Sequence, residues 1–162
     1  MRKLQIVFLL MIITFCSFTV MGQTVKLLTL DQLDQRITKG GDTVYVINFW
    51  ASWCAPCLKE LPYFEKLSQT TRKDKVKVLL ISLDFKSKLT STVVPIVKSL
   101  KLKNEVYLLN ENNQQAYIER IDKDWSGALP ATLFINKVKS KRIFKEQEFT
   151  FQELINTYQQ IK

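Results

Sequence analysis

The chain passes from a strand pattern into a helical pattern at the place where its two central cysteines lie. Val44–Trp50 contains no charged residue and is rich in β-branched and aromatic side chains, which predicts a strand buried in the centre of a sheet. Cys54-Ala55-Pro56-Cys57 follows after three residues, and a helix is expected over residues 55–68. Its apolar residues recur at steps of three: Leu58, Leu61, Phe64 and Leu67. A buried strand that leads directly into a helix is typical of α/β folds, so this junction restricts the fold class.

Cys54 and Cys57 stand at the expected start of this helix. The unpaired N–H groups and the dipole of a helix start stabilise a thiolate, which is the nucleophilic form of cysteine. Two intervening residues keep the second sulfur within bonding reach of the first, so Cys57 can resolve a mixed disulfide formed at Cys54. We therefore expect a redox-active disulfide in which Cys54 is nucleophilic and exposed and Cys57 is shielded.

A structural staple is the alternative interpretation of this cysteine pair. Closing a loop of four residues stabilises a fold by only about 2 kcal/mol in the chain-entropy model, so a purely structural role is the weaker explanation. Zinc is disfavoured, because a structural site needs four thiolate or imidazole ligands and a catalytic site usually three. The sequence has no histidine and no second cysteine pair after the leader. We expect no metal and no cofactor.

Residues 1–22 differ in kind from the rest of the chain. Arg2 and Lys3 precede an apolar run over residues 4–21, which is typical of an export signal. Cleavage after Gly22 would leave residues 23–162 as one domain. The run is also near the lower length limit of a membrane span, so a retained N-terminal membrane anchor is the alternative. Both interpretations predict a periplasmic protein.

The charge of the chain is positive. After residues 1–22, 22 basic and 15 acidic residues leave an excess of seven positive charges, which is compatible with anionic partners or a membrane surface. The basic residues are scattered along the sequence, and the densest group, residues 137–145, alternates with apolar residues as a strand does. No aromatic and basic residues interleave as in proteins that stack bases. We interpret the charge as a solvated surface and expect no nucleic-acid partner.

The remaining chain alternates between helical and strand patterns. Asp31 is expected to cap a helix that runs to about Lys39, and Thr150 and Glu153 form a capping box before the last helix. The other expected elements are strands at 76–83, 106–109, 132–136 and 142–148 and helices at 90–100 and 113–121. This order predicts an α/β fold, with a mixed sheet flanked by helices and with a hairpin and a helix at the C-terminal end.

Three motifs in combination resemble the thioredoxin fold. They are Phe49-Trp50-Ala51-Ser52-Trp53-Cys54-Ala55-Pro56-Cys57, then Pro62 five residues after the second cysteine, and Ala128-Leu129-Pro130-Ala131-Thr132 before a strand. The chain is more narrowly similar to exported thiol-disulfide oxidoreductases of the TlpA and ResA type. Glu60 follows Cys57 by three residues, and a helix and a strand are inserted at about residues 88–110. The resemblance covers roughly residues 25–162 and implies a thioredoxin-like mixed sheet with an inserted helix–strand unit.

This resemblance implies a substrate-binding surface around the cysteines. It implies that Leu129-Pro130 is a cis peptide facing them, and that Leu129 offers its backbone to an extended substrate peptide. Taken without the family, Pro130 reads as an ordinary turn proline before a strand. Trp53, Ala55 and Pro56 are expected to complete the surface.

The two other tryptophans are less clearly assigned. Trp50, like Trp53, is expected to shield the dithiol and to shape the docking surface. Trp125 lies near the Pro130 loop and belongs either to that surface or to the core, since large aromatic residues are more often core.

Glu60 is the expected proton acceptor for Cys57, because it lies one helical turn beyond that residue. Asn48 stands where cytosolic thioredoxins carry an acidic residue on the strand under the dithiol, which leaves Glu60 as the available replacement. The alternative is a solvated carboxylate that pairs with Lys59 or Lys66.

We expect an enzyme, a protein-disulfide reductase. The dipeptide Ala55-Pro56 lacks the histidine of strongly oxidising relatives, which favours the reducing direction. The expected partners are a disulfide-containing protein substrate and a membrane electron donor, and the protein is expected to be a monomer. The resemblance suggests cytochrome c maturation or the repair of exported proteins. A periplasmic oxidant or isomerase and a redox-inert interaction domain are the alternatives, and a metal-binding chaperone is disfavoured by the lack of histidine.

Overall fold

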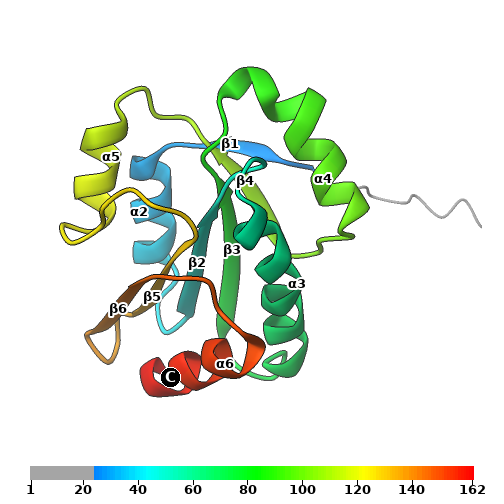
Figure 1. Ribbon diagram of the computed structural model, residues 1–162. Helices are drawn as coiled ribbons and strands as arrows, with labels where there is room; N and C mark the ends of the chain where they lie inside the picture. The colour runs from blue at the N-terminus through cyan, green and yellow to red at the C-terminus, as the bar shows by residue number, and fades with distance from the viewer. Residues whose placement is uncertain (1–23) are drawn as a thin grey trace, which may run out of the picture.

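Six strands form one mixed sheet with helices on both faces in a computed structural model that describes residues 24–162 (Figure 1). The strands are β1 (Lys26–Leu28), β2 (Val44–Trp50), β3 (Val76–Ser82), β4 (Glu105–Leu109), β5 (Ala131–Asn136) and β6 (Lys141–Glu146). The helices are α2 (Leu30–Lys39), α3 (Ala55–Thr70), α4 (Val94–Ser99), α5 (Gln114–Ile121) and α6 (Phe151–Ile161). The expected leader, residues 1–22, lies outside the described residues.

The sheet has the strand order β1-β4-β3-β2-β5-β6. Strands β1, β4, β3 and β2 are parallel, whereas β5 is antiparallel to β2 and β6 is antiparallel to β5. The α4–β4 unit inserts β4 between β1 and β3, and the β5–β6 hairpin and α6 close the chain. The predicted thioredoxin-like fold, with its inserted helix–strand unit and its C-terminal hairpin and helix, is therefore confirmed.

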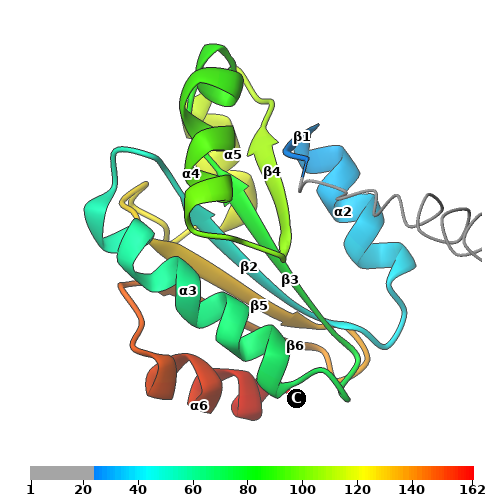
Figure 2. The ribbon, with the colours of Figure 1, turned by 90° about the vertical axis from the view of Figure 1, so that its right-hand side faces the viewer.

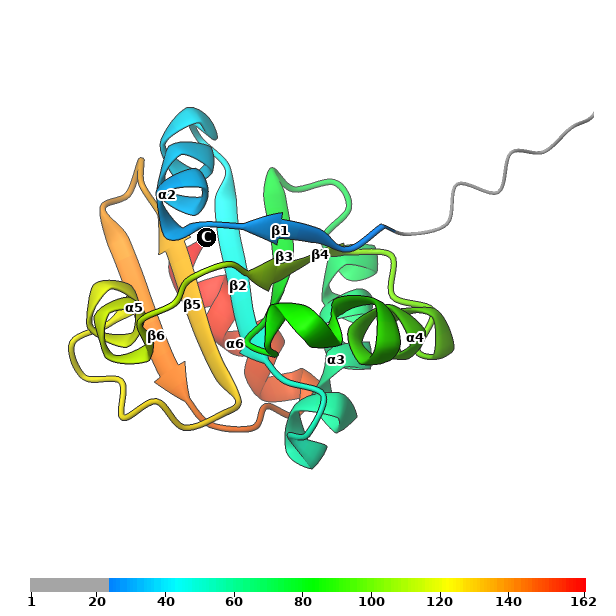
Figure 3. The ribbon, with the colours of Figure 1, turned by 90° about the horizontal axis from the view of Figure 1, so that it is seen from above.

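Strand β2 is buried along its whole length and separates two apolar layers. Successive side chains of a strand point to opposite faces, so Val46 and Trp50 pack on one side and Ile47 and Phe49 on the other. Helices α3 and α6 cover the first face, and α2 and α5 cover the second. Figure 2 shows α3 and α6 on one side of the sheet and α2 on the other, and Figure 3 shows the same layers from above. Both apolar layers lie within residues 24–162.

Helix α2 begins differently from the prediction. The N-cap is Thr29, whose Oγ1 accepts a hydrogen bond from Gln32 N at 3.2 Å, while Gln32 Oε1 accepts one from Thr29 N at 2.9 Å. Asp31 is inside the first turn and binds Arg120 at 2.6 Å, so the prediction that Asp31 caps the helix is wrong. Thr29 and Gln32 have the spacing of a capping box, which is the stronger start signal because it satisfies two backbone N–H groups.

Two further elements differ from the sequence prediction. Strand β1 was not predicted, because three residues at a sheet edge are too few to show a period. The region expected to be one helix from residue 90 contains a π-helical segment, Leu89–Val93, before α4, and Pro95 lies in the first turn of α4. No helix within residues 24–162 has the length and apolar character needed to cross a membrane.

Thr29→Ala is expected to lower the free energy of unfolding by about 1 kcal/mol, because the Gln32 N–H loses its acceptor. Asp31→Ala removes an exposed ion pair and is expected to cost at most about half as much. Urea unfolding of both variants at neutral pH measures the difference. A larger loss for Asp31→Ala than for Thr29→Ala would contradict the assignment of the cap.

Candidate redox site

Cys54 and Cys57 are joined by a disulfide at the start of α3, with an S–S distance of 2.04 Å and a Cα–Cα distance of 5.2 Å. Cys54 is the N-cap residue of α3, and its sulfur accepts a hydrogen bond from Cys57 N at 3.3 Å. The pair follows the carboxyl end of β2 directly, as in α/β proteins that place their sites at this edge of the sheet. The first turn of the helix therefore directs a backbone N–H at the sulfur of Cys54.

The two cysteines differ in accessibility, but less than expected. Cys57 is fully buried, and Cys54 keeps 5% of its surface exposed. The expectation that Cys54 is exposed is wrong for this oxidised form, because the residue is part of the apolar cluster on the α3 face of the sheet. Cys54 is nevertheless the only one of the two that reaches the surface.

Asp84 holds the loop between β2 and the disulfide. Its Oδ2 accepts from Ser52 N at 2.9 Å and from Ser82 Oγ at 2.7 Å, and its Oδ1 accepts from Ser52 Oγ at 2.6 Å. The side chain is buried with 5% exposure. Sequence reasoning missed Asp84, although a carboxylate two residues beyond a buried strand, at the edge that carries the dithiol, was an available signal.

Glu60 is buried in the core and is held by hydrogen bonds from two distant segments. Its Oε1 accepts from Asn48 Nδ2 at 2.8 Å, and its Oε2 accepts from Phe149 N at 2.7 Å. Asn48 Nδ2 also donates to Thr132 Oγ1 at 3.1 Å. Glu60 and Asn48 both have no exposed surface. The carboxylate thus connects β2, α3 and the segment before α6.

Burial raises the pKa of Glu60 from 4.5 to about 7, although the hydrogen bonds from Phe149 and Asn48 act in the opposite direction. The alternative of a solvated Glu60 paired with a neighbouring lysine is wrong. Lys59 pairs instead with Glu148 at 2.7 Å, and Lys66 lies 4.0 Å from the centre of the Phe151 ring. Glu60 is therefore a carboxyl group that can take up or release a proton near neutral pH.

The Leu129-Pro130 peptide is cis and lies beside the end of β2. Ala131, the next residue, pairs with Phe49 across the β2–β5 ladder. Trp125 braces this loop, since its Nε1 donates to Ala128 O at 2.8 Å. Trp125 is 4% exposed and its ring lies 5.3 Å from that of Phe49, so it belongs to the core.

A groove of about 580 Å³ opens beside this loop. Trp53 and Phe85 line it and are 72% and 83% exposed, and half-buried Leu129 contributes to its wall. Trp50 is fully buried in the α3-side core, so the expectation that it shapes the docking surface is wrong. Phe85 was missed, because one aromatic residue in a loop has no sequence signal of exposure.

Ala55 and Pro56, between the two cysteines, are exposed at the surface. The structure therefore brings together at one edge of the sheet the dithiol, the cis-proline loop and the exposed Trp53. Among residues 24–162, no group of three or more cysteine, aspartate or glutamate side chains could hold a metal ion.

The family model described as AhpC/TSA matches residues 14–140. The chain belongs to the AhpC/TSA family. It is 44% identical over 63 residues to a thioredoxin of Malassezia sympodialis, which is 39% of this chain and 58% of that protein. It is 34% identical over 74 residues to sporulation thiol-disulfide oxidoreductase A of Bacillus subtilis, which is 46% of this chain and 44% of that protein. The chain thus spans about half the length of these curated family relatives.

Solved structures support the same thioredoxin-related fold. A thioredoxin-related protein from Neisseria meningitidis serogroup B superposes with a TM-score of 0.62 at 22% identity, covering 72% of this chain and 83% of that one. StoA from Bacillus subtilis superposes with a TM-score of 0.55 at 24% identity, covering 71% of this chain and 81% of that one. The predicted resemblance to thioredoxin-fold proteins of the TlpA and ResA type is confirmed, and the comparisons add StoA.

The raised pKa of Glu60 predicts a specific pH dependence of stability. Unfolding returns the pKa to about 4.5, so between about pH 4.5 and 7 the unfolded chain loses a proton that the folded chain keeps. The free energy of unfolding of the oxidised protein is therefore expected to fall by about 3 kcal/mol over this window and to stay level above it. Urea unfolding from pH 4 to 9 measures this slope.

Glu60→Gln is expected to lose that part of the slope, since the amide does not titrate. Glu119→Gln, which removes an exposed carboxylate, is the matched control and is expected to keep it. An unchanged slope in Glu60→Gln would show that Glu60 does not titrate in this range.

Proposed function

We propose that this chain is an exported thiol-disulfide oxidoreductase that reduces disulfides in protein substrates through Cys54 and Cys57. The observation that carries the proposal is a disulfide at the start of α3 with a buried carboxyl group one helical turn further on. Two similar proteins support it by their names: sporulation thiol-disulfide oxidoreductase A of Bacillus subtilis, and thiol-disulfide oxidoreductase ResA of Oceanobacillus iheyensis, which is 41% identical over 39 residues. The activity is proposed for the whole chain and not only for the segments that match these relatives.

In the proposed reaction the reduced protein transfers two electrons to a substrate disulfide. The Cys54 thiolate attacks one sulfur of the substrate disulfide and forms a mixed disulfide with it. The substrate S–S bond breaks, and the other substrate sulfur leaves as a thiolate. The Cys57 thiolate then attacks Cys54, which forms the protein disulfide and releases the second substrate thiolate. Both substrate sulfurs end as thiols after protonation. The protein must then be re-reduced, for which we propose a membrane electron donor.

Glu60 is proposed to accept the proton of Cys57 before this second step. A group titrating near pH 7 suits the role, because it is ionised often enough to accept a proton and protonated often enough to return it. Asn48 is proposed to position the carboxylate through its 2.8 Å hydrogen bond. Among the described residues, Glu60 is the only carboxyl group of α3 that is fully buried, in the same helix as the fully buried Cys57.

The substrate peptide is proposed to dock beside the cis-proline loop. Leu129 would pair its backbone with an extended strand that carries the substrate disulfide, and Pro130 would hold the loop against the cysteines. The exposed Trp53, Ala55 and Pro56 would contact the same peptide.

The reducing direction and the location are proposals of the same kind. The Ala55-Pro56 dipeptide carries no positive charge that would over-stabilise the thiolate, which supports a reductant. The sequence of residues 1–22 supports export to the periplasm by a cleaved signal or a retained anchor. Cytochrome c maturation or the repair of exported proteins would provide the disulfide substrates. The protein is proposed to act as a monomer.

The roles of the cysteines predict an order of labelling. Iodoacetamide at neutral pH is expected to alkylate Cys54 of the reduced protein before Cys57, because Cys57 is fully buried even in the disulfide. Cys57→Ser is expected to accumulate mixed disulfides with substrate, and Cys54→Ser is not. Peptide mapping and non-reducing electrophoresis measure the two effects. Preferential labelling of Cys57 would contradict the assignment.

The proposed reducing direction predicts the reduction potential of the Cys54–Cys57 pair. Equilibration with glutathione buffers is expected to give a value near that of thioredoxin, roughly −270 mV, rather than the roughly −120 mV of a strong periplasmic oxidant. A value close to −120 mV would reverse the proposed direction, and a pair that cannot be reduced without unfolding would favour a redox-inert domain.

A further inference from the structure

Basic residues that are scattered along the sequence gather at the end of the sheet opposite the dithiol. Val44, at the start of β2, pairs with Val76 on one side and with Asn136 on the other, and Asn136 pairs with Lys141. The last turns of α2, α3 and α6 lead to this end, where Asn136 Nδ2 donates to Ile161 O at 2.9 Å. We call it the basic end. Its basic residues are Arg36, Lys39, Arg72, Lys73, Lys75, Lys77, Lys137, Lys139, Lys141 and Lys162, and its acidic residues are Asp42, Asp74 and Glu105.

The residues named at the basic end carry a large excess of positive charge. Residues 23–162 contain 22 basic and 15 acidic residues, an excess of seven. Ten basic and three acidic residues at the basic end also leave an excess of seven, so twelve of each sign remain elsewhere. This end of the molecule is therefore strongly positive, which is not the distribution of a uniformly solvated surface.

Most of these charges are not neutralised by carboxylates. Lys75 pairs with Asp42 at 2.5 Å, Lys162 with Asp74 at 2.8 Å, and Arg36 with Glu105 at 2.6 Å. Lys77 lies 3.8 Å from the same Glu105. The other six have no ion pair within residues 24–162 and are exposed: Lys39, Arg72, Lys73, Lys137, Lys139 and Lys141.

An exposed apolar side chain lies among these lysines. Val138, in the turn between β5 and β6, is 69% exposed and is flanked by Lys137 and Lys139. Lys139 Nζ and Lys141 Nζ donate to carbonyl groups at the end of α6, which sets the turn against that helix. An apolar residue between cations is the composition of segments that enter the headgroup region of a bilayer.

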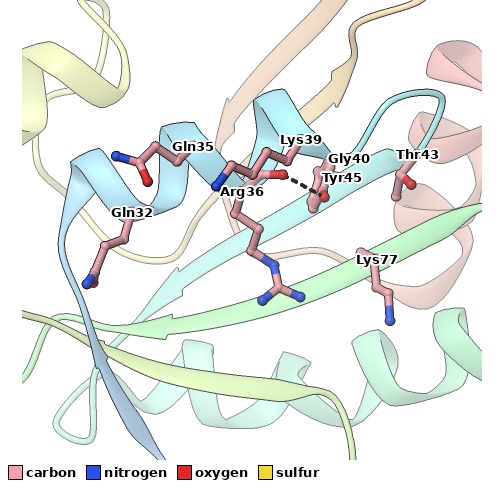
Figure 4. Close-up of a pocket in the computed structure, with 8 residues that line it drawn as sticks. All are labelled: Gln32, Gln35, Arg36, Lys39, Gly40, Thr43, Tyr45 and Lys77. Atoms are coloured by element: carbon pink, nitrogen blue, oxygen red, sulfur yellow. Dashed lines mark hydrogen bonds between the residues drawn. The ribbon is translucent and has the colours of Figure 1, made fainter.

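The basic end also contains a shallow recess of about 400 Å³. Figure 4 shows its lining, with the side chains of Arg36 and Lys77 on the same side of the turn that joins α2 to β2. Tyr45 closes it by donating its hydroxyl to Arg36 O at 3.0 Å. Lys39 also lines the recess and has no carboxylate partner among the described residues, whereas Glu105 offsets part of the charge of Arg36 and Lys77.

The described chain enters the fold at β1, the edge strand on the far side of the sheet from β6. Thr24 leads into β1, and β1 runs parallel to β4 with Lys26 opposite Tyr107. The N-terminal ends of β1, β2, β3 and β4 therefore lie along one edge of the sheet, and the dithiol lies at the other. Figure 2 shows the start of β1 on the side of the molecule away from the start of α3. The apolar residues 4–21 are joined to the domain at this edge.

We propose that the basic end docks on an anionic phospholipid surface. Each basic residue is attracted to such a surface when it lies within a Debye length of it, and Val138 enters the headgroup layer. An acidic protein would satisfy the charge equally, but the exposed Val138 among the lysines favours lipid. The six residue steps of β2 then place the dithiol roughly 20 Å further from the membrane, facing soluble substrates. This inference is independent of the direction of the redox reaction.

Amide hydrogen exchange of the full chain in lipid nanodiscs tests the proposal. We expect the amides of residues 137–141 to exchange about tenfold more slowly in discs with ~30 mol% phosphatidylglycerol than in discs of phosphatidylcholine alone. The difference in exchange between the two lipids is expected to vanish in ~0.5 M NaCl. The Debye length then becomes shorter than the distance between the lysines and the anionic headgroups. Arg2 and Lys3 are also attracted to the anionic lipid, so the effect of residues 1–22 is removed by comparing variants that all keep these residues.

Two variants with the same loss of charge separate the basic end from total charge. The triple substitution of Lys137, Lys139 and Lys141 by Gln is expected to abolish the difference between the lipids. Replacement of Lys88, Lys123 and Lys145 by Gln removes three exposed lysines elsewhere and is expected to keep it. Thermal unfolding of both variants shows that they are folded.

Two outcomes would overturn the proposal. Equal exchange of residues 137–141 in the two lipids would show that the basic end does not meet the membrane. Protection by added poly-glutamate in discs of phosphatidylcholine, without protection by phosphatidylglycerol, would identify the basic end as a site for an acidic protein instead.

Discussion

The burial of β2 on both faces is the constraint on which the rest of the structure depends. A strand without solvent contact must be paired on both edges and covered on both faces, and β3, β5 and the two helix layers meet those needs. The same strand ends where the dithiol begins, and its pairing with β5 sets the Leu129-Pro130 loop beside it. The position of the redox site thus follows from the packing of one strand.

The apolar core around β2 also contains a polar group, the carboxyl group of Glu60. Glu60 reaches back from α3 to Asn48 on β2 and accepts a hydrogen bond from Phe149 N. Placing a carboxyl group there opposes folding above neutral pH, because burial favours the protonated form. Glu60 lies in the same helix as the disulfide, one turn after Cys57, so the group that lowers stability is also the one proposed to accept the proton of Cys57.

The two ends of the parallel strands carry different surface features. One edge of the sheet carries the disulfide, the exposed Trp53 and the groove, and the opposite end carries the charge excess. The two features share the direction of the parallel strands, so a surface that binds one end directs the other end away from it. The proposed docking on a membrane and the proposed binding of a substrate can therefore occur together.

The sequence by itself determined the elements whose signals are local. The uninterrupted apolar run of β2, the three-residue repeat of α3 and the capping box at Thr150 each act over a few residues, so their positions were predicted correctly. The motif around Cys54 and Cys57 likewise predicted the site and its family. Strand β1 was missed because three edge residues form only through their partner β4.

Only the tertiary structure decided what depends on contacts between distant segments. Asn48 and Phe149 make Glu60 a buried carboxyl group, and burial is what moves its pKa. Trp50 became core although Trp53, three residues away, became surface, because the strand ends between them. The lysines look dispersed in the sequence, yet the turns that carry them meet at one end of the sheet. The electrostatic interaction between charges depends on their separation in space, which cannot be read from the order of residues.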